Sequence, residues 1–167
     1  MHNKLTKVDI RKMQEEIDYR EVTLRPKLLE DVKVARAFGD LSENDEYKIA
    51  KREKNLNESR IRHLKRMINS AIIIDVDSKD GEVGVFDKVT VFIEEDNEEE
   101  TYTIVTNTRQ DVLKNLISLE SPMGRALLKH KEGDRVLIKV SDDYSYYVKI
   151  VKIEKGVDDD SLPIRKY

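Results

Sequence analysis

The first 75 residues place apolar side chains at helical spacing, and this pattern predicts two long helices. In the first helix the apolar positions recur at intervals built from threes, fours and sevens, at Ile10, Met13, Ile17, Leu24, Leu28 and Ala35. In the second helix the intervals alternate between three and four, through Tyr47, Ala50, Lys54, Asn57, Ile61, Leu64, Ile68 and Ala71. Such an alternation is a heptad seam, here with polar residues in its middle. Because the connecting loop is short, we expect an antiparallel coiled-coil hairpin.

Several residues mark where these helices should begin, bend and end. Thr6 followed by Asp9 predicts a capping box that opens the first helix. Gly39 is expected at the C′ position after it, and Ser42 is expected to be the N-cap of the second helix. Pro26 lies inside the first helix, where it should either kink the helix or split it into two shorter ones.

After residue 75 the apolar period changes to two, which predicts β-strands. The polar, turn-rich segment DVDSKDGEVG, from Asp75 to Gly84, is the expected junction. The segments DKVTVFIEE, ETYTIVT, DRVLIKV and YYVKIVKIEK then alternate β-branched and polar residues. Ser121 as N-cap and Pro122 at the first helical position predict one short helix between the second and third of these strands.

The predicted fold class is therefore α+β, with two domains and a tail. A coiled-coil hairpin is expected over residues 1–75. A small, mostly antiparallel sheet domain with one short helix is expected over residues 76–155. The final segment, GVDDDSLPIRKY at 156–167, is expected to be mobile.

Composition narrows the class of protein. Charged residues make up 39% of the chain and hydrophobic residues 38%, a balance that suits long exposed helices with a narrow buried stripe. The absence of cysteine excludes disulfides and Cys-based zinc sites. The N-terminus lacks the apolar stretch of a secretory signal, and the longest aliphatic run, Ala71–Ile74, is too short to span a membrane. We expect a cytoplasmic protein that does not associate with membranes.

Four carboxylates surround the predicted turn of the hairpin: Asp40, Glu43, Asp45 and Glu46. Helix capping and the helix dipole account for Asp45 and Glu46. Asp40 and Glu43 are three residues apart across a tight bend, so their carboxylates could instead converge on a divalent cation. Two carboxylates alone bind magnesium weakly, and a useful site would need further ligands from elsewhere. The residues by themselves leave both interpretations open.

A cluster of cations stands next to these acids, formed by Arg36, Lys48, Lys51 and Arg52. Such a cluster can contact the phosphates of a nucleic acid. The simpler alternative is a solvated helix face, on which long charged side chains are common. Few aromatic residues accompany the cluster, so base stacking is weakly supported.

The stretch RPKLLEDVKVARAFGDLSENDEYKIAK resembles the Gre transcript-cleavage factors (GreA/GreB) of bacterial RNA polymerase. The family pattern in this region is an Ala-Arg pair followed by Gly-Asp-Leu-x-Glu-Asn-x-Glu-Tyr. The resemblance continues through NLISLESPMGRALL and GDRVLIKV and covers about residues 5–155. Pro26 after Arg25 also matches the family, which implies a kink within the hairpin helix.

The resemblance implies a partner and a mechanism. The hairpin of these factors enters the secondary channel of RNA polymerase and meets the 3′ end of the nascent RNA. Asp40 and Glu43 would then help to hold a second magnesium ion in the polymerase active site, without binding it alone. Arg36, Lys51 and Arg52 would lie near the RNA. The chain itself would be a monomer without a cofactor of its own, and it would not be an enzyme.

The second domain resembles the FKBP-like domain with which these factors dock on the polymerase rim. Glu120, Ser121 and Pro122 match the docking loop. The start of a helix would also account for Ser121 and Pro122. Two residues depart from the family pattern. Asp45 stands where a small residue is usual, and Asp87 stands where glycine is common.

Other functions are open to a chain of this kind. A Gre-fold paralogue would occupy the channel and inhibit polymerase without promoting cleavage. The presence of Asp40 and Glu43 argues against this alternative, and the unusual Asp45 argues for it. A zinc-containing channel regulator is disfavoured by the lack of cysteine. A prolyl isomerase needs an aromatic-lined pocket, and the chain has no Trp and three Phe. The modest basic cluster favours GreA-like over GreB-like behaviour.

Overall fold

The computed structural model describes residues 3–39, 44–76, 79–158 and 160–166. Its backbone contacts group into two units, which we call the hairpin unit and the sheet unit. The hairpin unit contains Ile10–Ala71, and the sheet unit contains Asn3–Asp9 together with Ile72–Tyr167. The sequence assigned residues 3–9 to the hairpin, whereas their contacts lie with the sheet.

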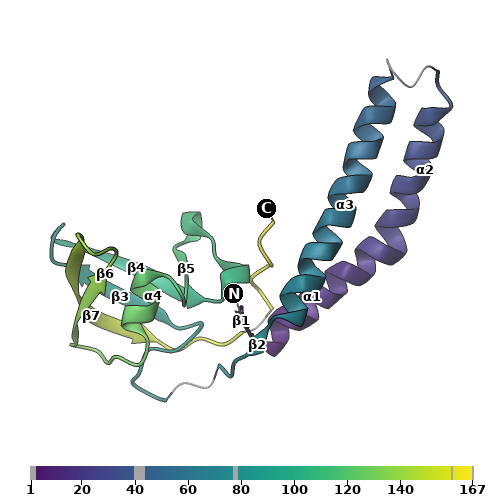
Figure 1. Ribbon diagram of the computed structural model, residues 1–167. Helices are drawn as coiled ribbons and strands as arrows, with labels where there is room; N and C mark the ends of the chain where they lie inside the picture. The colour runs from purple at the N-terminus through teal and green to yellow at the C-terminus, as the bar shows by residue number, and fades with distance from the viewer. Residues whose placement is uncertain (1–2, 40–43, 77–78, 159, 167) are drawn as a thin grey trace. The chain divides into compact units, whose positions relative to one another are not determined.

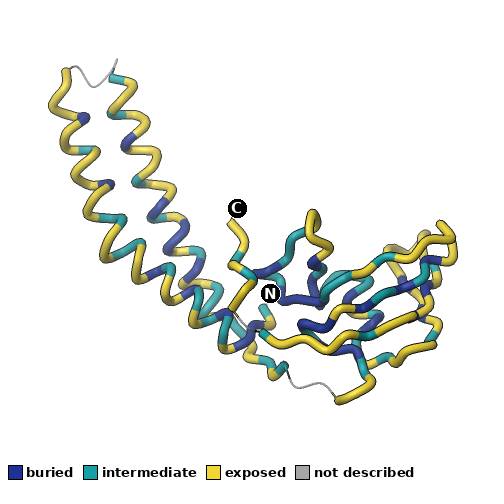
Figure 2. Tube along the Cα trace, turned by 180° about the vertical axis from the view of Figure 1, so that it is seen from behind, coloured by how far each residue is buried: buried dark blue, intermediate teal, exposed yellow. Residues whose placement is uncertain are grey.

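The hairpin unit has two antiparallel arms (Figure 1). Its elements are α1 (Lys7–Tyr19), a π-helical turn (Arg20–Leu24), α2 (Arg25–Arg36) and α3 (Asp45–Asn69). The predicted seam is confirmed, because none of its eight residues on α3 and just beyond it is exposed. Figure 2 shows the buried positions on the inner side of each arm. No helix in the described part of the chain is long and apolar enough to cross a membrane.

Pro26 lies in the first turn of α2, directly after the π-helical turn. Proline has no N–H, and its ring clashes with the carbonyl four residues earlier in a regular α-helix. The chain avoids this clash with a wider turn, which is closed by a bond from the Arg25 N–H to the Arg20 carbonyl. The Asn57 side chain supports this turn, because its Nδ2 donates to the Arg20 carbonyl at 3.3 Å and its Oδ1 accepts from Arg20 Nη1 at 2.9 Å. The helix therefore continues through the proline region and does not split.

A carboxylate in the middle of the hairpin joins both arms. Glu16 accepts from Arg20 Nε at 2.8 Å, and from Arg60 Nε and Nη2 at 2.8 and 3.1 Å. Burial raises the pKa of Glu16, but the hydrogen bonds from Arg60 and Arg20 outweigh burial, so the pKa is lowered overall. Glu16 and Arg60, which lie beside the seam, are thus paired across the hairpin.

The sheet unit is built on five strands in the order β5-β4-β3-β7-β6. They are β3 (Lys88–Ile93), β4 (Glu98–Val105), β5 (Leu116–Ser118), β6 (Arg135–Lys139) and β7 (Ser145–Glu154). All neighbours pair antiparallel except β4 and β5, which are parallel. The four predicted strands are confirmed; β5 was missed because three residues are too few to show an alternation. A small parallel pair, β1 (Lys4–Leu5) with β2 (Ile72–Ile73), completes the unit.

The core of the sheet unit lies between one face of the sheet and α4 (Pro122–Leu127). The predicted alternation is visible on β6, where Val136 and Ile138 are buried and their neighbours are exposed. Leu127 of α4 is fully buried against this face. The predicted fold class, a helical hairpin followed by a mostly antiparallel sheet domain with one short helix, is confirmed.

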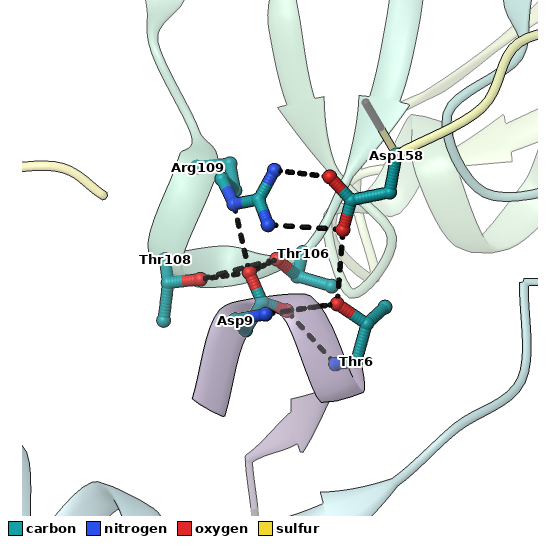
Figure 3. Close-up of polar contacts among 6 residues, drawn as sticks. All are labelled: Thr6, Asp9, Thr106, Thr108, Arg109 and Asp158. Atoms are coloured by element: carbon teal, nitrogen blue, oxygen red, sulfur yellow. Dashed lines mark hydrogen bonds and ion pairs between the residues drawn. The ribbon is translucent and has the colours of Figure 1, made fainter. Parts of the chain in front are cut away.

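The predicted capping box at the start of α1 is also confirmed. The Thr6 N–H donates to Asp9 Oδ2 at 2.9 Å, and the Asp9 N–H donates to Thr6 Oγ1 at 3.2 Å. The Asp9 carboxylate is fully buried and accepts two further hydrogen bonds at Oδ1, from Thr106 Oγ1 at 3.1 Å and Thr108 Oγ1 at 2.9 Å (Figure 3). One aspartate thus caps a helix and binds a distant segment of the sheet unit.

A fully buried arginine links this aspartate to the C-terminal tail. Arg109 Nε lies 2.9 Å from Asp9 Oδ1 in an ion pair rather than a directed hydrogen bond. Its Nη1 and Nη2 donate to the two carboxylate oxygens of Asp158 at 2.6 and 2.9 Å (Figure 3). We call this set the Arg109 network; its members are Thr6, Asp9, Thr106, Thr108, Arg109 and Asp158.

The remaining tail contacts lie in the same unit. Leu162 packs against the buried cluster of Phe86, Val105 and Leu116, and the Arg165 N–H donates to the Thr108 carbonyl at 2.6 Å. These contacts differ from the mobile tail that the sequence predicted. A polar composition suggested mobility, but the tail's partners lie far away along the chain and are invisible to composition.

The start of the tail explains why aspartate replaces glycine at position 87. The buried Asp87 carboxylate accepts from the Gly84 N–H at 2.7 Å, from the Gly156 N–H at 2.9 Å and from Lys155 Nζ at 2.9 Å. The unusual backbone belongs to its neighbour Phe86, whose φ is 71°. The Asp87 carboxylate therefore binds the start of the tail.

Asp158→Ala should destabilise the sheet unit by about 3 kcal/mol, because it leaves two buried N–H groups of Arg109 without their carboxylate. Urea denaturation followed by tyrosine fluorescence measures the change. Asp142, whose side chain is fully exposed, provides the control; Asp142→Ala should change the stability by less than about 0.5 kcal/mol. Equal stabilities of the two variants would contradict a structural role for the Arg109 network.

The stability of the hairpin should fall with acidification, in part through Glu16. Its lowered folded pKa means that its contribution is present above the usual value near 4.5 and is lost as the pH falls through the folded pKa. Glu16→Gln should lower stability at neutral pH and flatten this dependence, as measured by thermal unfolding under far-ultraviolet circular dichroism. Glu15→Gln, at an exposed carboxylate on the same helix, should keep the parental slope; an unchanged slope in Glu16→Gln would refute the assignment.

Candidate functional site

The predicted metal-directing acids, Asp40 and Glu43, lie outside the described residues, but the helix ends that flank them are described. The arm that leads to the tip ends with Ala37 as the C-cap of α2. Gly39 was predicted at the C′ position, but with Ala37 as the C-cap that position belongs to Phe38, and Gly39 is the next residue. The φ of Gly39 is 135°, a value that other residues rarely adopt. The returning arm begins with Asp45.

Asn44 ties the two arms together at the base of the turn. Its Oδ1 accepts from the Tyr47 N–H at 3.1 Å and so caps α3, while its Nδ2 donates to the Ala35 carbonyl of α2 at 2.7 Å. The predicted cap, Ser42, was wrong, because the helix starts later and Asn44 is its N-cap. An amide offers an acceptor and two donors, so Asn44 can cap one helix and bond to the other at once.

The acids that follow Asn44 occupy the first turn of α3, as predicted. Asp45 and Glu46 both lie where carboxylates favour the positive end of the helix dipole. The Asp45 side chain is 87% exposed, and Lys48 Nζ lies 3.9 Å from its carboxylate. Asp45 thus adds a solvent-facing negative charge directly beside the turn.

Arg36 lies against Tyr47, on the opposite arm. Its Nη2 donates to the Tyr47 hydroxyl at 3.2 Å, and its guanidinium carbon lies 5.4 Å from the centre of the ring. The hydrogen bond from Arg36 lowers the pKa of Tyr47, and the positive charges of Lys51 and Lys54 lower it further. These three cations therefore share one electrostatic environment around the phenol.

A shallow groove of about 360 Å³ follows the outer side of α3. We call its surface the basic face; it is lined by Lys48, Lys51, Arg52, Asn55, Leu56 and Ser59. Two of the three predicted RNA-contacting residues, Lys51 and Arg52, lie together here. Arg36 does not line this groove, and its side chain is directed to Tyr47 instead. The described lining carries no carboxylate, so its charge suits phosphate groups.

The predicted docking loop lies at the start of α4. Ser121 Oγ caps this helix by accepting from the Gly124 N–H at 3.0 Å, and Pro122 is its first residue. Glu120 accepts a hydrogen bond from Asn107 Nδ2. The three residues are half-buried, so the fold fixes their positions while part of each side chain stays accessible.

No group of three or more His, Cys, Asp or Glu residues that could hold a metal occurs within the described segments.

Comparison with known proteins bears on both units. A family described as "Transcription elongation factor, N-terminal" matches residues 3–73, and one described as "Transcription elongation factor, GreA/GreB, C-term" matches residues 78–155. The chain belongs to the GreA/GreB family of transcription elongation factors. The matched ranges end at residue 155, so the tail that completes the Arg109 network lies beyond them.

Two GreA proteins agree with this assignment. Transcription elongation factor GreA of Oenococcus oeni is 41% identical over 153 residues, which cover 91% of this chain and 94% of the relative. GreA of Caldanaerobacter subterraneus is 44% identical over 137 residues, covering 81% of this chain and 87% of the relative. Among solved structures, the GreA factor homolog 1 (Gfh1) protein of Thermus thermophilus is 24% identical with a TM-score of 0.42, covering 93% of this chain and all of that one.

Two residues that organise this end of the hairpin were missed as functional candidates. In the sequence, Asn44 stood out only as part of the family pattern, and Tyr47 only as part of that pattern and of the seam. The two residues are three apart, which is the spacing between an N-cap and the N–H that it binds, so this spacing could have predicted the cap. The contact of Tyr47 with Arg36 left no signal in the sequence.

The ionisation of Tyr47 should report on the cations around it. Its pKa should lie below the usual value of 10, and Arg36→Met should raise it because the hydrogen bond from the guanidinium is lost. Nuclear magnetic resonance of ring-labelled tyrosine during a pH titration measures both values. Arg62→Met, at an exposed cation farther along α3, should leave the pKa unchanged; a shift of equal size there would contradict a specific contact with Arg36.

Proposed function

We propose that this chain binds bacterial RNA polymerase, inserts its hairpin into the secondary channel and stimulates the cleavage of backtracked nascent RNA. Membership of the GreA/GreB family supports the partner. The observation that carries the proposal is the Asn44 bridge, which joins the ends of α2 and α3 that flank Asp40 and Glu43 in the sequence. A turn with fixed ends can present two carboxylates to a second active site at little cost in conformational entropy.

In this proposal the chain contributes ligands and positioning, and the hydrolysis is that of the polymerase. Asp40 and Glu43 supply carboxylate oxygens, which are the donors that magnesium prefers. A divalent ion in the polymerase active site activates water and stabilises charge on the phosphoryl oxygens. The chain needs no cofactor of its own, because the remaining ligands come from the polymerase.

The cations behind the turn would hold the RNA. Lys51 and Arg52 on the basic face are placed to contact phosphates, and such contacts weaken as salt concentration rises. Arg36 would act from the other arm, where its contact with Tyr47 limits the positions of its guanidinium. These residues would keep the RNA 3′ segment near the two acids.

The sheet unit would dock on the polymerase rim through Glu120, Ser121 and Pro122. Because the helix cap holds this loop in place, docking would require little rearrangement. The chain would act as a monomer in the cytoplasm, where it meets transcribing polymerase.

A second function is supported by one observation. The exposed charge of Asp45 beside the turn could disturb metal binding or attract a cation away from the pair. A factor altered in this way would occupy the channel and slow elongation without raising cleavage.

A transcript-cleavage assay on stalled bacterial polymerase separates these functions. The unsubstituted chain should raise cleavage in magnesium, whereas Asp40→Asn and Glu43→Gln should each lower the stimulated rate by at least about tenfold because a metal-directing carboxylate is lost. Both variants should bind polymerase as tightly as the parent. Short products would identify GreA-like behaviour and longer ones GreB-like behaviour.

Asp45→Asn is the matched control, because it removes a neighbouring carboxylate whose charge interacts with the dipole of α3. It should retain cleavage. Full activity of both Asp40→Asn and Glu43→Gln would overturn the assignment of the tip, and slowed elongation without any rise in cleavage would favour the inhibitor.

A further inference from the structure

A second groove lies near the tip of the hairpin, between α2 and α3, and has a volume of about 310 Å³. We call it the acidic groove. Its described lining consists of Asp31, Val34, Ala35, Phe38, Glu46, Ile49, Ala50 and Glu53. On both arms these residues recur at spacings of three and four, so each arm presents one continuous side to the groove.

The floor and the rim of the acidic groove differ in chemistry. Ala35 and Ala50 form the floor and are buried, and their small side chains leave a depression between the helices. The rim carries large apolar side chains that face solvent: Phe38 is 70% exposed, Ile49 59% and Val34 47%. Single exposed apolar residues are ordinary, but three around one depression form a surface that favours a partner.

Charge narrows the class of partner. The lining includes three carboxylates, those of Asp31, Glu46 and Glu53, and no Lys or Arg among its described residues. No ion pair joins these carboxylates to another residue that the structure describes. A phosphate backbone would be repelled, whereas an apolar side chain flanked by Lys or Arg would satisfy both the depression and its rim.

The basic face and the acidic groove occupy different sides of the same end of the hairpin. Each residue of α3 advances about 100° around the helix, so Glu46, Ala50 and Glu53 point away from Lys48, Lys51 and Asn55. If RNA lies along the basic face, protein must line the other side of a channel that encloses the hairpin. This step rests on the proposed function.

We infer that the acidic groove docks a segment of RNA polymerase that carries an apolar side chain flanked by Lys or Arg. The segment would insert its apolar side chain above Ala35 and Ala50, between Phe38 and Ile49. Its cations would pair with Glu46 and Glu53. The groove would thereby add to the affinity of the hairpin for the polymerase, while the basic face on the other side stays free to meet the RNA.

Binding of the full-length chain to polymerase tests this inference. Phe38→Ser and Ile49→Ser should each weaken binding by about tenfold, as expected when a central apolar contact is removed. Leu29→Ser is the matched control, since Leu29 is 51% exposed but lies on the opposite side of α2, and it should bind within about twofold of the parent. Circular dichroism should show the same helix content for all three.

The charge of the groove is tested separately. Glu53→Lys should weaken binding, whereas Glu30→Lys, which makes the same change at an exposed site outside the groove, should have little effect. At saturating concentration the groove variants should still stimulate cleavage, because Asp40 and Glu43 are intact. Loss of maximal cleavage with unchanged affinity would overturn a docking role.

Photo-crosslinking identifies the occupant. With benzoylphenylalanine in place of Ile49, the chain in complex with stalled polymerase should crosslink to a polymerase peptide that contains Lys or Arg. The same group in place of Asn55, on the basic face, should not label that peptide. Crosslinks from position 49 to RNA or to a second copy of this chain would overturn the inference.

The two hypotheses fail in different ways. If the unsubstituted chain neither binds polymerase nor raises cleavage, the proposed function fails and the inference fails with it. If the unsubstituted chain does both while Phe38→Ser, Ile49→Ser and Glu53→Lys behave like Leu29→Ser, only the inference fails.

Discussion

The buried guanidinium of Arg109 is the strongest constraint on the sheet unit. A charge without access to water is tolerated only when carboxylates and hydrogen-bonding groups replace its hydration. Asp9 and Asp158 provide this replacement, and the threonines around Asp9 satisfy that carboxylate in turn. Three segments far apart in the sequence must therefore meet at one place: the start of α1, the turn after β4 and the tail. Packing of the sheet alone would impose no such requirement.

The hairpin meets a similar demand with two buried residues, Asn57 and Arg60, and the half-buried Glu16. Its seam contains Asn57, and the neighbouring Glu16 and Arg60 bridge the two arms. Polar groups at such positions are satisfied in one register only, since sliding one arm past the other would separate them. Leucine and isoleucine in their place would tolerate several registers. The register in turn sets which residues reach the tip, so the pairs in the middle of the hairpin position Asn44 and the turn above it.

Periodic features of the chain could be predicted from the sequence, and features that depend on distant partners could not. The heptad seam, the four long strands and the Thr6–Asp9 box each leave a local pattern, and each is confirmed. The π-helical turn could not be predicted, because a proline indicates that the regular α-helix is interrupted but does not indicate the geometry of the interruption. The tail looked mobile because the partners of Asp158 and Leu162 lie more than forty residues away in the sequence. At the candidate site, Lys51 and Arg52 line one groove of α3, whereas the bridge made by Asn44 depends on a carbonyl of the opposite arm that no local pattern reveals.

The contacts of the tail also set an order of events during synthesis. Residues 10–71 leave the ribosome early and contain both arms of the hairpin, so this unit has all its partners long before translation ends. The sheet unit is different, because Arg109 must wait for Asp158, which is made 49 residues later. Until then a buried position would hold an arginine with only one of its two carboxylates. The nascent chain therefore carries a complete hairpin before the sheet unit can close around Arg109, because that closure requires Asp158.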